Sequence, residues 1–85
     1  MGNYKLLIKP SAAKELEATP KRDHLRIVRK IQALAQNPRP PGCEKLSVEA
    51  KYRVRQGWYR IIYSVDDRNQ TVLVVKVGHR REVYR

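Results

Sequence analysis

Residues 51–65 read KYRVRQGWYRIIYSV, and their alternation on either side of a glycine predicts a β-hairpin. In the first half, basic residues alternate with Tyr52 and Val54, and in the second half aromatic and aliphatic residues recur at every second position. Side chains two residues apart in a strand point to the same face of a sheet. Gln56-Gly57 supplies a turn between the two segments. We therefore expect paired strands, the second of them beginning at Trp58.

A third strand is predicted for residues 71–77, TVLVVKV, which are nearly all apolar and mostly β-branched. Such a run is typical of a strand covered on both faces, so we expect it to be central in the sheet. Residues 66–70 are polar and form the turn that precedes it.

The N-terminal part begins with a fourth strand in residues 4–9, where apolar and basic positions alternate until Pro10. Ser11 is the expected N-cap of a short helix that runs to about Ala18. Thr19 and Pro20 are the expected N-cap and first residue of a second helix.

The second helix carries an apolar stripe at three- and four-residue spacing, formed by Ile27, Val28, Ile31, Leu34 and Ala35. Its basic residues lie mostly off this stripe, and we interpret them as accessory at best. Asn37-Pro38 ends the helix. The resulting order is β-α-α-β-β-β, an α+β fold in which a helical hairpin packs on a small, mainly antiparallel twisted sheet.

The 85 residues are enough for one hydrophobic core and too few for two, so residues 1–85 are expected to be a single domain. Residues 38–42 form a rigid surface connection inside it. Cys43 is the only cysteine, which excludes an internal disulfide and a cysteine metal site. No apolar run approaches the roughly 20 residues that cross a bilayer. No apolar leader follows Met1, and we expect a cytoplasmic protein without a membrane role.

The formal net charge of +11 is very high for this length and favours a polyanionic partner, with nucleic acid first. Strand alternation sends Lys51, Arg53 and Arg55 to one face, and the adjoining strand can place Arg60 beside them. No acidic residue interrupts this stretch. Arginine grips phosphate oxygens in two places and can stabilise a phosphoryl transition state. The alternatives are a solubilising surface and an ordinary solvated sheet face.

The last residues add groups that can move protons. His79 is a candidate proton carrier, and nearby arginines would make the phenol of Tyr84 more acidic. A lone surface histidine and a packing tyrosine are the alternative interpretations.

The segments YRVR at 52–55, WYRIIY at 58–63 and VGHRREVY at 77–84 together resemble the RelE family of bacterial toxins. The likeness spans nearly the whole chain, and the arginine-then-tyrosine ending after a glycine is its most specific part. This resemblance implies an mRNA endonuclease that acts in the ribosomal A site and is held inactive by a cognate antitoxin.

Carried over by position, the resemblance implies catalytic roles for Arg60, Arg80 and Tyr84, to which we add His79. Arg53 and Arg55 match two strand positions that are commonly lysines in the family. Exchange for arginine keeps the charge but removes a group that loses a proton easily. Proton transfer therefore falls on Tyr84, His79 or the more distant Glu44. The RNA-binding set is completed by Lys51 and Arg81.

The sequence offers no cluster of Asp, Glu and His for a metal, so we expect no metal and no cofactor. RNA supplies its own nucleophile, the 2'-OH, with Tyr84 as base. The expected partners are mRNA, the ribosome and an antitoxin whose acidic amphipathic segment covers the arginines. A gyrase-poisoning toxin like ParE, which shares the superfamily fold, and a non-catalytic RNA-binding module are the alternatives.

Overall fold

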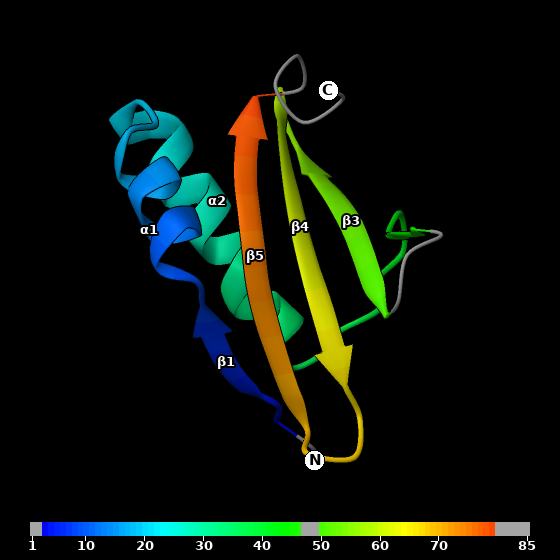
Figure 1. Cartoon of the computed structure of the whole chain (residues 1–85). Helices are drawn as coiled ribbons and strands as arrows, with labels where there is room; N and C mark the ends of the chain where they lie inside the picture. The colour runs from blue at the N-terminus through cyan, green and yellow to red at the C-terminus, as the bar shows by residue number, and fades with distance from the viewer. Residues whose placement is uncertain (1–2, 47–49, 80–85) are drawn as a thin grey trace.

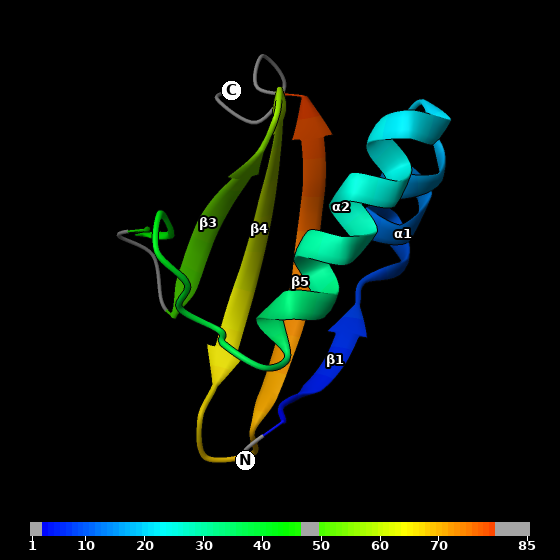
Figure 2. The same ribbon diagram turned by 180° about the vertical axis from the view of Figure 1, so that it is seen from behind.

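The computed structural model describes residues 3–46 and 50–79, in which two helices lie on the same side of a five-stranded sheet (Figures 1 and 2). In chain order the elements are β1 (Lys5–Ile8), α1 (Pro10–Glu17), α2 (Lys21–Leu34), β2 (Glu44–Lys45), β3 (Lys51–Gln56), β4 (Tyr59–Asp66) and β5 (Thr71–His79). The predicted α+β class and the predicted order are confirmed, with one short additional strand, β2, before the hairpin.

The strand order across the sheet is β1-β5-β4-β3-β2, which places the first and last strands of the chain side by side. β1 and β5 are parallel, and all other neighbours are antiparallel. β2 joins the outer edge through the pairs Glu44↔Arg53 and Lys45↔Tyr52. Two residues are too few to show a period, so the sequence gives no signal for this strand.

The predicted hairpin is confirmed with a two-residue turn. Gln56 pairs with Tyr59, so Gly57 and Trp58 form the turn, and Gly57 has the positive φ of 62° that glycine tolerates best. β4 therefore begins at Tyr59 and not at Trp58. Trp58 is 64% exposed and therefore does not pack in the core.

Both predicted helix starts are wrong by one or two residues. The N-cap of α1 is Lys9, and Pro10 takes the first helical position, where its missing N–H costs no hydrogen bond. Pro20 is the N-cap of α2, with extended backbone angles. The hydroxyl of Thr19 donates to the carbonyl of Leu16 at 2.7 Å, so this side chain closes α1 and does not cap α2.

The core lies between the helices and one face of the sheet. α2 contributes the buried residues of its predicted stripe, Ile27, Ile31 and Leu34. The sheet contributes mainly aliphatic side chains and two tyrosines: Tyr52, Val54, Ile61, Tyr63, Val65, Val72, Val74 and Val77. Side chains at the alternate positions of β3 and β4 therefore point to the other face, which the helices leave uncovered.

β5 is internal, as predicted, but the helices cover only one of its faces. The pairing with β4 shifts register, because Ile62 pairs with Lys76 whereas the next residue, Tyr63, pairs with Val74. One extra residue in β5 reverses the alternation. Val72 and Val74 are buried before the bulge and Val77 after it. Because the bulge shifts the buried positions from even-numbered to odd-numbered residues, apolar residues are needed at both. This explains the nearly continuous apolar run of β5, from which burial on both faces was predicted.

Candidate nucleic-acid interface

Four cations of β3 and β4 lie on the uncovered face of the sheet. Lys51, Arg53 and Arg55 alternate with the buried residues of β3, and Arg60 is the direct register partner of Arg55. Residues directly opposite in antiparallel strands share a face. The structure thus brings these four residues to one face, here called the cationic face. Like charges at this spacing repel, which favours an anion between them.

Arg60 is the most buried member of the cationic face, with only 4% of its surface exposed. It lies between Arg55 on β3 and Gly78 on β5, and the glycine adds no side chain beside it. Guanidinium groups keep their charge in proteins. A cation that is largely withdrawn from water attracts a phosphate more strongly than a fully solvated one.

An acidic residue also reaches this face, which corrects the expectation that Glu44 lies at a distance from the site. Glu44 on β2 is the register partner of Arg53, and its Oε1 accepts hydrogen bonds from the Nε of Arg53 at 3.0 Å and from its Nη2. The Arg53 guanidinium lowers the pKa of the Glu44 carboxyl, with smaller contributions from Arg55 and Arg60. Glu44 is therefore a carboxylate near neutral pH and a poor proton donor. The contact between Glu44 and Arg53 cannot be recognised from the sequence, because it depends on the pairing of β2 with β3.

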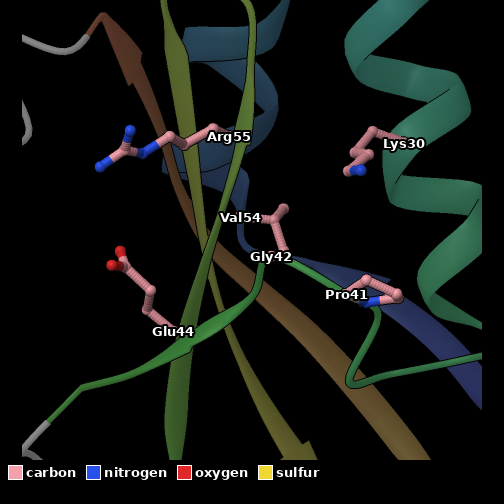
Figure 3. A pocket seen from close by; sticks show the side chains of 6 residues that line it. All are labelled: Lys30, Pro41, Gly42, Glu44, Val54 and Arg55. Atoms are coloured by element: carbon pink, nitrogen blue, oxygen red, sulfur yellow. The ribbon is translucent and has the colours of Figure 1, made fainter.

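A pocket of about 370 Å³ lies at the edge of the sheet between α2 and β3 (Figure 3). It is lined by Lys30, Pro41, Gly42, Glu44, Val54 and Arg55. Figure 3 shows Lys30 on the helix facing β3, whereas Arg55 and Glu44 extend on the other side of the strand. The pocket therefore adjoins the cationic face. Lys30, interpreted from sequence as accessory, is part of its wall.

His79 is at the end of β5, where it is the register partner of Tyr59. The two rings meet edge to face, with centroids 5.6 Å apart and an interplanar angle of 81°. Strand alternation places this pair on the face opposite to Arg60 and Gly78. His79 is thus near the cationic face in sequence but is not brought onto it. Arg80, Arg81 and Tyr84 lie outside the described residues.

Two further features concern metals and membranes. Within residues 3–46 and 50–79, no three His, Cys, Asp or Glu side chains come together as a metal site. No helix in these ranges has both the length and the apolar character to span a membrane.

Comparison with known proteins places the chain in a family of toxins. The family model described as the ParE toxin of type II toxin-antitoxin systems, parDE, matches residues 6–84, and the chain belongs to this family. Toxin RelG of Mycobacterium tuberculosis is 41% identical over 34 residues, which are 40% of this chain and 39% of that relative. The matched segment thus spans well under two thirds of RelG.

Solved structures of RelE toxins share the whole fold. The archaeal RelE-RelB complex from Pyrococcus horikoshii matches with a TM-score of 0.83 and 28% identity, covering 92% of this chain and 96% of that one. The isolated E. coli RelE toxin matches with a TM-score of 0.80 and 26% identity, covering 95% and 90%. The resemblance read from the sequence is confirmed at the level of the RelE/ParE superfamily.

Proposed function

We propose that this toxin is a metal-independent endoribonuclease that cuts mRNA in the ribosomal A site and so inhibits translation. The observation that carries the proposal is the cationic face, with Arg55 and Arg60 paired across the hairpin on the side of the sheet that the helices leave uncovered. A phosphodiester bound there meets guanidinium groups from two adjacent strands. Membership in a toxin family and the RelE-like fold support the same assignment.

In the proposed reaction, Tyr84 takes the proton from the substrate 2'-OH, and the 2' oxygen forms a bond to the adjacent phosphorus. The bond from phosphorus to the 5' oxygen breaks, leaving a 2',3'-cyclic phosphate and a 5'-OH. Arg60 and Arg80 hold the phosphate and balance its extra negative charge. Lys51, Arg53, Arg55 and Arg81 bind the RNA backbone.

The leaving 5' oxygen needs a proton, and two routes are proposed for it. In the first, the arginines of the site stabilise the departing oxygen through their N–H donors and keep their own protons, and water protonates the oxygen. In the second, His79 gives the proton, provided that it leaves Tyr59 and reaches the opposite face when RNA binds. The geometry favours the first route, because His79 contacts Tyr59 on the other side of the sheet.

The proposed protein partner is a cognate antitoxin in the cytoplasm, with an acidic amphipathic segment that covers the cationic face. The P. horikoshii match is itself a RelE-RelB complex. The pocket between α2 and β3 suits an apolar side chain of such a segment, because Val54 lies in its wall beside Lys30. Acidic residues of the same segment would then meet Arg55.

DNA gyrase inhibition is the second candidate function, because the family model that matches the chain is that of ParE toxins. A toxin of this kind would not need the cationic face for chemistry. A non-catalytic RNA-binding module is the third, and its mark is salt-dependent binding without new RNA ends.

The deciding experiment adds the purified chain to a reconstituted bacterial translation reaction stalled on a defined mRNA and maps new RNA ends by primer extension. Tyr84→Phe, Arg60→Ala, His79→Gln and the control Arg68→Ala are assayed beside it. Arg68 is an exposed cation in the β4–β5 turn, so its loss tests charge alone. Circular dichroism establishes that each variant is folded, which matters most for the buried Arg60.

New ends at the A-site codon that disappear in Tyr84→Phe and Arg60→Ala, but persist in Arg68→Ala, are the expected result. Retained cleavage in His79→Gln would favour the route in which the arginines stabilise the departing oxygen and water supplies its proton. A folded wild-type chain that produces no new ends, yet inhibits gyrase supercoiling, would replace the nuclease proposal by the second candidate. Cutting of matched DNA would contradict the mechanism, because DNA lacks the 2'-OH.

A further inference from the structure

Trp58 is the single tryptophan of the chain, and the fold displays it at the tip of the β3–β4 hairpin. The pairs Gln56↔Tyr59 and Arg55↔Arg60 follow directly on the strand side of the turn. A two-residue turn closed in this way holds its side chains in place. Figure 1 shows this turn at the same end of the sheet as the end of β5.

Burial in the core does not account for an indole at this position. Its neighbour Tyr59 packs against the core cluster, whereas Trp58 does not belong to that cluster and is 64% exposed. The turn itself requires a positive φ at Gly57 but no aromatic residue after it. Single exposed apolar residues are common on protein surfaces. Trp58 differs from such residues because it lies next to the cationic face.

Trp58 is two positions from Arg60 in the sequence and three positions from Arg55. At about 3.3 Å per strand residue, the indole starts roughly 7–10 Å along the backbone from the two arginines. An extended single strand whose phosphate lies between these arginines therefore carries a neighbouring base into reach of Trp58. Cations that hold the backbone, combined with an aromatic side chain for a base, are the usual arrangement for binding single-stranded nucleic acid.

We propose that Trp58 is a stacking platform for a nucleobase of single-stranded RNA, next to the phosphate held by the cationic face. Every base has a π face, so stacking tolerates any sequence, but purines offer the larger surface and are preferred. The inference rests on the RNA part of the proposed function and does not require cleavage. Trp58 is a binding residue in this role, since it touches substrate away from the reacting atoms.

The test uses the fluorescence of Trp58, which is a site-specific signal because the chain has one tryptophan. The intact chain is titrated with a fluorescein-labelled 2'-O-methyl oligoadenylate, which lacks the 2' nucleophile, and with the corresponding oligouridylate. Anisotropy of the label measures binding, and the tryptophan emission of an unlabelled titration measures stacking. We expect the emission to be quenched in step with binding, and oligoadenylate to bind more tightly than oligouridylate.

Trp58→Ala is expected to weaken oligoadenylate binding roughly 5- to 100-fold, and Trp58→Tyr to restore part of the loss. The salt dependence should stay unchanged in Trp58→Ala, whereas Arg55→Ala should lower its slope by about 0.7 because one phosphate contact is lost. Leu25→Ala is the control, since Leu25 is an exposed apolar residue on α2, and it should bind as the wild type does.

Binding without quenching, and with equal affinity in Trp58→Ala, would overturn the stacking role and leave the cationic face as the binding site. Absence of any binding to either oligonucleotide would overturn it as well, while the primer-extension assay still decides the nuclease proposal. Normal RNA binding by Trp58→Ala together with lost affinity for the antitoxin would reassign Trp58 to the protein interface. Conversely, full quenching of the Trp58 emission without ribosomal cleavage would contradict the nuclease proposal and support the stacking of a base on Trp58.

Discussion

Arg39 and Asp67 join the loop after α2 to the β4–β5 turn through two hydrogen bonds, with Nη1 and Nη2 at 3.2 and 2.8 Å from the two carboxylate oxygens. The same guanidinium donates from Nε to the hydroxyl of Tyr52 at 3.0 Å and lies 5.1 Å from the centre of its ring. Tyr4 donates to Asp67 at 2.7 Å. This network joins distant segments at the end of the sheet that lies away from the β3–β4 turn.

The Arg39–Asp67 pair predicts a stability difference that depends on pH. Hydrogen bonds from Arg39 and Tyr4 lower the pKa of the Asp67 carboxyl from its usual 3.8. A lowered folded-state pKa means that the stabilisation is present above the unfolded value and disappears as pH falls through the folded value. Asp67→Asn should therefore melt at a lower temperature than the wild type at pH 7, and the difference should vanish in strong acid.

Thermal melts followed by circular dichroism between pH 2 and pH 7 measure this difference. Arg39→Ala should abolish most of its pH dependence, because the guanidinium is the main cause of the pKa shift. A melting difference that stays constant down to pH 2 would show that Asp67 acts through something other than its charge.

Replacing Tyr63 should lower stability more than replacing Asp67, and the loss should not depend on pH. Its side chain is fully buried, stacks on Tyr52 at 5.8 Å, and donates from its hydroxyl to the carbonyl of Pro38 at 2.7 Å. Tyr63→Phe leaves that buried carbonyl without its donor, which should lower the free energy of unfolding by about 1–3 kcal/mol. Tyr52→Phe should cost less, because Arg39 keeps its bonds to Asp67. Urea denaturation of both variants checks the order, and equal losses would contradict it.

Glu44 predicts that removing an acid tightens RNA binding. Its carboxylate forms an ion pair with the guanidinium of Arg53, whose side chain is only 17% exposed. Glu44→Gln removes the carboxylate that competes with phosphate for Arg53, which should raise the affinity for single-stranded RNA and steepen the salt slope by about 0.7. Glu17→Gln removes the same charge from an exposed position on α1 and serves as the control. An equal gain in both variants would indicate a general charge effect and not competition between Glu44 and phosphate for Arg53.

Replacing Glu15 should cause a local loss of stability at the end of β5. β1 pairs with β5 only as far as Val74, and beyond it the Oε1 of Glu15 accepts from the backbone N–H of Val77 at 2.9 Å. Its Oε2 accepts from Lys76 at 2.8 Å. Glu15→Ala should lower the free energy of unfolding by about 1–2 kcal/mol and speed exchange of the Val77 amide. Lys76→Ala should leave that amide protected, and rapid exchange there as well would point to the ion pair instead.

Much of the fold follows from local periodicity. The hairpin of residues 51–66 and the apolar stripe of α2 each have a clear hydrophobic period, and Gly57 marks the turn of the hairpin. The turn before β5 is indicated by a run of five polar residues, 66–70. Helix starts are less determined, because Lys9 and Pro20 are unusual N-caps and the better capping residues, Ser11 and Thr19, lie one or two positions away.

The candidate site could be predicted only in part. Alternation alone assigns Lys51, Arg53 and Arg55 to one face, and the hairpin register adds Arg60. Glu44 and Lys30 have no such signal, because their positions depend on a two-residue edge strand and on how α2 packs. His79 was expected beside the arginines. It follows Gly78, which lies on the face of Arg60, and therefore points to the opposite face, where it contacts Tyr59.

By itself, the amino-acid sequence determined both helices and the four longer strands and placed Lys51, Arg53, Arg55 and Arg60 in one hairpin, because side-chain period and turn chemistry act over a few residues. The tertiary structure alone decided the bulge in β5, the pairing of Glu44 with Arg53 and the exposure of Trp58. These depend on which strands become neighbours and in what register, and that choice is made by packing between residues far apart in the chain.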